Sequence, residues 1–194
     1  MTARQYLIWE HSGDPKLCTL SSLENVEDSY NLSYGVSRVE GFSTNALFRM
    51  SQEDRRAIKL VDDVRNEDFL IVASKQLKEF LELEQLIDTE YLRVSIYDHK
   101  NRIVSDEYYI IHQVGTQDCI DVKKSRIVWN LINPEQIAEV ERLVLDAARI
   151  QEDVKLFRAK YLPQAILLRE DVAVRIMNAG FSGMSFQPIS EYIF

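Results

Sequence analysis

The sequence predicts an α+β fold, in which helices pack on a mixed, largely antiparallel sheet. Short apolar runs rich in Tyr, Ile and Val recur from about residue 69 onward, as β-strands require. Only three segments combine helical spacing of apolar residues with a capping signal, so strands should outnumber helices. Hydrophobic residues make up 46% of the chain and charged residues 28%, which is enough apolar material for a folded core.

The first sixty residues carry weaker signals than the rest. Residues 6–9 read as an opening strand, and residues 11–45 are rich in Ser, Asn, Asp and Gly, which is typical of long loops. Residues 46–50 are expected to be extended, and residues 54–64 could form a short helix or a strand. We therefore expect residues 1–60 to be a loop-rich part of the same domain, and residues 61–194 to hold its better-defined α+β part.

A strand–helix–strand unit is predicted over residues 69–97. Residues 69–73 form a compact apolar run, and Ser74 follows as a helix N-cap. Leu77 and Leu81 continue at helical spacing to about residue 86. Residues 91–97 alternate as a strand does, and a polar turn at residues 98–101 follows.

The middle of the chain predicts strands followed by a helix. Residues 107–114 and 119–122 are expected to pair across a connection at residues 115–118, and residues 127–129 form a further short strand. Asn133 would then cap a helix with Pro134 in its first position. Its buried stripe would consist of Ile137, Val140, Leu143, Val144 and Ala147.

The last part of the chain predicts a second strand–helix–strand unit. Strands at residues 154–158 and 165–168 precede a helix over residues 169–177, with Gly180 in the left-handed position that ends it. Residues 184–189 form an edge strand, because Pro188 cannot donate to a ladder. Residues 69–96 and 165–189 share this order of elements, which leaves open a construction from two similar strand–helix–strand lobes.

Charge excludes several classes of function. The chain has 23 Lys and Arg against 31 Asp and Glu, a net charge of −8, whereas a nucleic-acid binder needs a basic surface.

No apolar run is long enough to span a membrane and no signal peptide opens the chain, so we expect a cytoplasmic protein without a membrane partner. Cys18 and Cys119 are far apart and are read as reduced thiols.

Catalytic and metal-binding motifs are weak. Cys119 and His112 could form a thiol–imidazole pair, but a packed free cysteine is the commoner arrangement. The acidic pairs at residues 62–63 and 67–68 could serve a hydrolase, although solvated surface explains them better. Asp98, His99 and Asp106 could ligate a metal, yet a polar turn explains them with less. We expect no cofactor, no metal and no enzyme.

The largest local charge asymmetry lies on and after the first predicted helix. It consists of Glu79, Glu82, Glu84, Asp88 and Glu90. A solvated helix face would account for these carboxylates. The functional interpretation is a partner-binding patch that attracts a basic protein surface and speeds its association.

A family resemblance rests on several short motifs in a fixed order. They are residues 108–114, 119–121 with Ser125, 143–146, 156–158, 166–172 and 179–188, preceded by the strand and Ser-capped helix from residue 68. This series resembles immunity protein family eleven of bacterial polymorphic toxin systems, formerly a family of unknown function. The resemblance covers roughly residues 62–188.

The resemblance implies a cytoplasmic antidote that binds a cognate toxin, encoded by a neighbouring gene, and inhibits it without chemistry. The motif side chains read as scaffold: Gly180 and Gly183 permit tight turns, Phe157 and Phe186 fill the core, and Arg158 pairs with a carboxylate such as Asp121 or Asp146. Tyr109 and Asp121 complete this structural set. A small hydrolase using carboxylates or the cysteine–histidine pair, and a regulatory scaffold module, stay open as alternatives, as does the oligomeric state.

Overall fold

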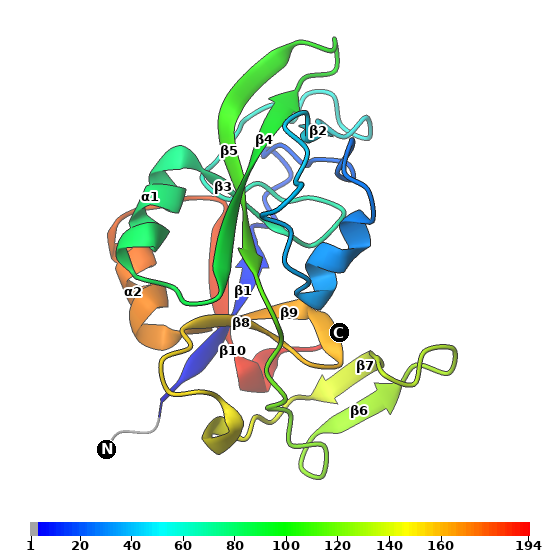
Figure 1. Cartoon of the computed structure of the whole chain (residues 1–194), viewed down its shortest axis with the longest axis vertical. Coiled ribbons are helices and arrows are strands. Elements are labelled where there is room, and N and C mark those ends of the chain that lie inside the picture. Colours follow the sequence, from blue (N-terminus) through cyan, green and yellow to red (C-terminus); the bar gives the residue numbers. More distant parts are fainter. Residues whose placement is uncertain (1–3) are drawn as a thin grey trace.

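The structure, a computed structural model, describes residues 4–194 and contains two four-stranded sheets, a separate hairpin and two α-helices (Figure 1). The strands are β1 (Tyr6–His11), β2 (Leu47–Arg49), β3 (Ile71–Ser74), β4 (Thr89–Tyr97), β5 (Ile103–Gln113), β6 (Arg126–Trp129), β7 (Ile137–Arg142), β8 (Leu156–Ala159), β9 (Leu162–Arg169) and β10 (Met184–Pro188). The α-helices are α1 (Lys75–Leu83) and α2 (Glu170–Asn178), and short 3-10 helices cover Ser29–Tyr34 (η1), Ala147–Arg149 (η2) and Ile189–Glu191 (η3). The predicted α+β class is confirmed.

The two large sheets share one construction. In the first, with strand order β2-β4-β5-β3, helix α1 joins β3 to β4 while β5 runs antiparallel between them. In the second, with order β10-β1-β9-β8, helix α2 joins β9 to β10 while β1 runs antiparallel between them. The pairing of β2 with β4 is parallel, which makes the first sheet mixed. The similar strand–helix–strand lobes expected from the sequence are therefore present.

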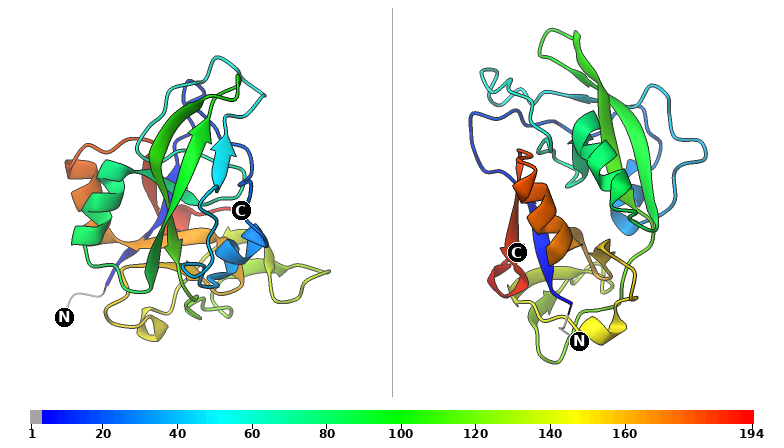
Figure 2. Two further views of the ribbon diagram at one scale, coloured as in Figure 1. Left: turned by 45° about the horizontal axis from the view of Figure 1, so that its top comes forward. Right: turned by 90° about the vertical axis from the view of Figure 1, so that its left-hand side faces the viewer.

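The two helices lie side by side between the sheets, and the central core forms around them (Figures 1 and 2). Leu77 and Leu81 of α1 and Val172 and Ile176 of α2 are all buried in one cluster with residues from both sheets. The ring of Phe80 meets that of Phe181 edge to face, with centroids 5.3 Å apart. Alternation along each strand sends every second side chain to this shared layer.

The outer face of each sheet has its own cover. Loops from residues 17–64 bury the first sheet's other face, with Leu20, Leu32 and Phe48 inaccessible to solvent. Residues 119–154 and the C-terminal segment cover the corresponding face of the second sheet, where Cys119, Ile137 and Val140 are buried. The fold thus has a central core and two outer cores.

The predicted start signal of α1 and the predicted end signal of α2 are confirmed. The hydroxyl of Ser74 accepts a hydrogen bond from the backbone N–H of Leu77 at 3.3 Å, as an N-cap does. After α2, Gly180 has a φ of +78°, the left-handed conformation expected there. Strand β10 lies at a sheet edge, as Pro188 indicates.

The helix predicted from Asn133 is wrong, because residues 137–142 form strand β7. Register shifts against β6 place two extra residues in β7, so that Ile137 and Val140 both pair with β6 while lying three positions apart. Bulges of this kind break the two-residue period of a strand and imitate helical spacing. Asn133 closes the hairpin turn instead, where its backbone N–H donates to the side chain of Asn130 at 3.0 Å.

Two further local predictions are also corrected. Residues 119–122 do not pair with β5; Ile120 makes a single bridge with Leu145. Residues 54–64 form neither a helix nor a strand but turns, with single bridges at Lys59 and Asp63. Within residues 4–194, no helix is long and apolar enough to cross a membrane.

Candidate functional site

Asp63 is the polar centre of the contact between the two lobes. Its side chain is fully buried, and it accepts hydrogen bonds from Trp9 Nε1 at 2.8 Å and from the backbone N–H of Val72 at 3.2 Å. Its Oδ2 also lies 2.9 Å from His11 Nδ1. Because Trp9 and His11 belong to β1 and Val72 to β3, one carboxylate ties the second sheet to the first. This placement corrects the expectation that Asp63 is solvated surface.

Asp62 also connects the two lobes, through a different set of partners. Its carboxylate accepts bonds from the Ser74 hydroxyl at 2.9 Å and from the hydroxyl and backbone N–H of Ser182 at 2.8 and 2.9 Å. The pair at residues 62–63, expected to be exposed, therefore joins the two lobes. We refer to these two carboxylates and their partners as the inter-lobe clamp; the partners are Trp9, His11, Val72, Ser74 and Ser182. Adjacent residues of an extended segment point in opposite directions, so each carboxylate reaches a different set of partners.

Gly183 closes the clamp through its backbone. Its φ is +96°, and a Cβ there would lie 2.2 Å from the carbonyl oxygen of Asp63. Its own carbonyl accepts the backbone N–H of Ser12 at 2.8 Å. The expected tight turn is present, and the close approach of two backbones adds a second reason for glycine.

His11 is the titratable group of this clamp that faces a hollow. Burial lowers the pKa of His11, but the charge and hydrogen bond of Asp63 together outweigh burial and raise it above its usual value. The imidazolium and the carboxylate then form a charge-assisted pair, which is stronger than a neutral hydrogen bond.

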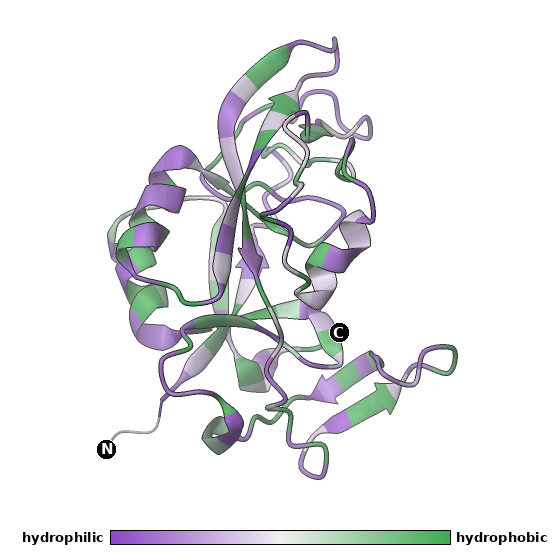
Figure 3. Ribbon diagram, viewed as in Figure 1, coloured by the Kyte–Doolittle hydropathy of each residue, from purple (hydrophilic) through white to green (hydrophobic). Residues whose placement is uncertain are grey.

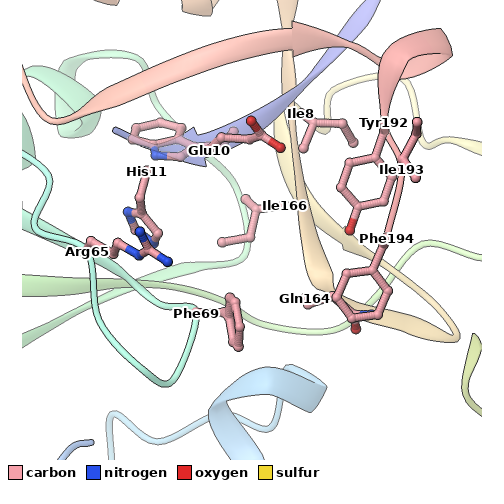
Figure 4. A pocket seen from close by; sticks show the side chains of 11 residues that line it. Ile8, Glu10, His11, Arg65, Phe69, Gln164, Ile166, Tyr192, Ile193 and Phe194 are labelled. Atoms are coloured by element: carbon pink, nitrogen blue, oxygen red, sulfur yellow. The ribbon is translucent and has the colours of Figure 1, made fainter. Parts of the chain in front are cut away.

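The hollow beside His11 has a volume of about 300 Å³ and lies between β1, β9, the loop before β3 and the C-terminal segment (Figure 4). Glu10, Arg65 and Gln164 supply its polar lining, and Phe69 and Phe194 supply aromatic surface. No Ser, Thr or Cys side chain is among the residues that line it. The hollow therefore offers charged and aromatic contacts, and it includes the hydroxyl of Tyr192, whose pKa burial raises.

A second hollow of about 420 Å³ continues this surface toward the end of the β6–β7 hairpin where the turn joins its two strands. It shares Phe69, Gln164 and Phe194 with the first. Phe69 has a φ of +54°, which is rare for an aromatic residue, and its ring is half exposed. Buried Asn66 holds this turn, because its side chain accepts the backbone N–H of Leu70 at 3.0 Å and donates to the Leu70 carbonyl at 2.6 Å.

Arg158 also supports the turn at Phe69. The sequence had suggested that Arg158 pairs with Asp121 or Asp146, and the structure corrects this expectation. Its guanidinium is fully buried and donates to the backbone carbonyls of Phe69, at 3.2 Å, and Pro163. It has no ion-pair partner within residues 4–194. Burial lowers the pKa of Arg158 to about 10.

The other residues of the predicted structural set occupy packing or turn positions. Phe157 contacts Tyr6 edge to face at 5.3 Å, and Phe186 contacts Trp9 in the same way at 5.1 Å. Tyr109 lies under the ammonium of Lys78, and Asp121 forms an ion pair with Lys124 at 2.9 Å that lowers the pKa of Asp121.

The acidic residues of the predicted patch divide into two groups. Glu84 forms a two-pronged pair with Arg175 of α2 at 2.6 and 2.7 Å, and Glu90 accepts the backbone N–H of Arg38 at 2.8 Å. Glu79, Glu82 and Asp88 are exposed, and Glu82 makes an ion pair with Lys78. Two of the five carboxylates are thus engaged in structural contacts, which leaves three facing solvent.

The cysteine and histidine of the proposed thiol pair lie in different surroundings. Cys119 is buried in the outer core of the second sheet, where burial raises its pKa to about 12. His112 is buried on β5, with Nε2 2.9 Å from the carbonyl oxygen of Val36, and burial lowers its pKa. Because its pKa is raised, the Cys119 thiol stays protonated near neutral pH, whereas nucleophilic catalysis needs the thiolate.

Two of the three residues considered as metal ligands pair with arginines, whereas the buried ring nitrogens of His99 have no hydrogen-bond partner in the described residues. Asp98 pairs with Arg102 at 2.6 Å and Asp106 with Arg93 at 2.9 Å. Over residues 4–194, no group of three His, Cys, Asp or Glu side chains is arranged to hold a metal ion.

Sequence reasoning missed the clamp and the hollow. Trp9 and His11 are 54 and 52 positions from Asp63, and Ser182 is 120 positions from Asp62, so no local spacing could join them. The sequence does contain one usable signal, which is His11. It is a titratable side chain that comes directly after the predicted apolar strand at residues 6–9 and Glu10.

Two comparisons bear on the chain's relatives. A comparison with curated proteins gave no match. The model of the immunity protein family Imm11 matches residues 20–191, which is most of the chain and includes Asp62, Asp63 and Gly183 of the clamp, the two helices and the hairpin, while β1 precedes the match. The chain therefore belongs to the Imm11 immunity protein family.

Proposed function

We propose that this protein neutralises a cognate bacterial toxin by binding it, and that it does so without catalysis in the cytoplasm of the cell that makes both proteins. The observation that carries the proposal is the family match over residues 20–191. The structure supports it with surface features suited to a protein partner: exposed aromatic and aliphatic side chains beside the two joined hollows.

Glu79, Glu82 and Asp88 are proposed to speed the encounter. They are exposed on and after α1, and the whole chain carries a net charge of −8. Long-range attraction of this kind raises association rates toward a basic partner and weakens with salt. Glu84 and Glu90 have internal partners and are proposed to contribute charge without direct contact.

The test of the function begins with the neighbouring gene product. We expect it to arrest growth when expressed alone, and we expect co-expression of this protein to restore growth. Affinity purification from native cells should recover that product in stoichiometric amount. A neighbouring product that is harmless, or a toxin that this protein neither binds nor neutralises, would refute the proposal.

The steering contribution has its own test. Replacing Glu79, Glu82 and Asp88 together with Lys should slow association with the toxin about tenfold at low salt. Dissociation should change little, because these side chains act before contact. The same substitutions should matter less at high salt. An association rate equal to that of the wild type at low salt would exclude the patch.

A further inference from the structure

The β6–β7 hairpin projects from the molecule (Figure 1), and the hydrophobic colouring of the ribbon reaches the tip of its turn (Figure 3). Leu131 is 100% exposed and Ile132 is 96% exposed. Val128, on β6, is also half exposed. Isolated surface aliphatics are ordinary, but three on one projecting hairpin form a surface suited to contact with another protein.

Strand β6 has an open edge. Its only pairing is with β7, and the backbone groups of residues 126–129 have no other hydrogen-bond partner within residues 4–194. The opposite edge of the hairpin is closed, because Val140 of β7 exchanges two backbone hydrogen bonds with Phe194 and Ile137 donates to the carbonyl of Tyr161. An open edge of this kind is a template for an added strand.

The other edges in the described chain are covered or blunted. Bridges from Glu24, Asp63 and Gln117 cover β2, β3 and β8. Strand β10 ends in a proline, and residues 103–107 of β5, which pair with β4 but extend beyond β3, carry two acidic side chains. Natural edge strands use such devices to prevent pairing, whereas β6 has the apolar sequence Ile127-Val128-Trp129.

A hollow lies against β6 and is bordered by Glu141 of the paired strand β7. Its volume is about 430 Å³, and its lining consists of Val122, Ser125, Arg126, Ile127, Val128, Trp129 and Glu141. Ile127 and Trp129 also pack against the outer core of the second sheet, so their side of β6 is apolar. The hollow gives the side chains of an incoming strand space to continue that core.

The net charge of the whole chain, rather than the charge of the hairpin, distinguishes between two possible occupants. Residues 119–145 contain four basic and four acidic side chains, so the hairpin region is neutral within a chain of net charge −8. A second copy of the chain would bring its own charge of −8 and be repelled as a whole, whereas a basic toxin would be attracted. The neutral edge itself opposes neither.

We infer that β6 is the docking edge for the toxin, which adds a β-strand to the hairpin through backbone hydrogen bonds. The strand has alternating residues: apolar side chains enter the hollow beside Ile127 and Trp129, and an acidic side chain lies beside Arg126, which has no ion-pair partner in the described chain. Leu131 and Ile132 contact an apolar surface next to that strand. This inference rests on the proposed function.

The test uses two matched double variants of the full chain. Val128→Lys with Leu131→Lys places charges on the open edge and its tip. Val104→Lys with Ile103→Lys is the control, because these aliphatic residues are also exposed and lie on a different hairpin. The first should weaken toxin binding by about tenfold or more and abolish growth rescue, while the control stays within about twofold of the wild type.

Hydrogen exchange supplies the direct readout. Backbone amides of residues 126–129 should gain protection in the toxin complex, and those of residues 103–107 should not. If the wild type binds and neutralises the toxin but the β6 variant does so equally well, the docking edge is wrong and the proposed function stands. If the wild type fails to bind the toxin, both are wrong.

A second copy of the chain at this edge would give a third result. The protein alone would be a dimer by light scattering, its residues 126–129 would already be protected without toxin, and the β6 variant would be monomeric. That result would overturn the inference.

Discussion

Replacing Gly183 with alanine should destabilise the protein far more than replacing Gly180, although both glycines have positive φ and lie three residues apart. Gly180 has open space where a Cβ would be placed. At Gly183 the same atom would lie 2.2 Å from the Asp63 carbonyl oxygen and 2.6 Å from Val61 Cγ2. Real Cβ atoms do not approach so closely, so the two backbones must separate.

The expected magnitudes follow from two separate costs. A non-glycine residue in the left-handed region costs about 1–2 kcal/mol, and this applies to both positions. Overpacking against a rigid neighbour costs about 1–3 kcal/mol more, and this applies to Gly183 alone. We therefore expect losses of about 1–2 kcal/mol for Gly180→Ala and about 2–5 kcal/mol for Gly183→Ala.

Urea unfolding followed by circular dichroism measures both free energies. For a chain of this length, 1 kcal/mol corresponds to roughly 2–4 °C in Tm, so the two variants should also separate in a thermal melt. The Gly183 variant should in addition expose the Ser12 amide to hydrogen exchange, since that amide donates to Gly183. Equal destabilisation by the two substitutions would refute the close approach as the reason for glycine.

Three further predictions concern buried polar groups. Asp63→Asn should lower the unfolding free energy by about 3–5 kcal/mol in urea, because it removes the buried charge that accepts from Trp9 and pairs with His11. Because the pKa of His11 is raised on folding, its contribution is complete below the unfolded value and is lost as pH rises through the folded one. The stability difference between wild type and His11→Asn should thus be larger at about pH 5.5 than at about pH 9, and a constant difference would contradict this reasoning. Cys18 and Cys119, whose pKa values burial raises to about 12, should react with a disulfide-exchange reagent at the rate of unfolding.

Local signals made the two helices predictable. Ser74 caps α1 through a bond to a residue three positions away, and both helices bury a stripe of residues four apart. Such signals lie within a few residues of each other, so the sequence alone contains them. Most strands were also identifiable, because their apolar runs are continuous or alternate.

The hairpin and the clamp were less accessible for different reasons. Bulges in β7 replaced the strand period with spacings of three, which the helix rule accepts. The clamp depends on pairings across the whole chain, and the adjacent carboxylates of Asp62 and Asp63 look like solvated surface until their distant partners are known. Arg158 was expected to pair with a carboxylate, but its guanidinium donates to the backbone carbonyl of Phe69, whose position depends on a turn that the sequence does not reveal.

The position of β1 in the second sheet has a consequence during synthesis on the ribosome. Tyr6–His11 is synthesised well before both of its neighbours, Leu162–Arg169 and Met184–Pro188. At about 5–20 residues per second, roughly 150 intervening residues keep this apolar segment unpaired for about 8 to 30 seconds. The first sheet can form in that interval, because β2 to β5 lie within residues 47–113. The nascent chain can thus be half assembled while Tyr6–His11 is still unpaired, and an exposed apolar strand of this kind is prone to aggregation.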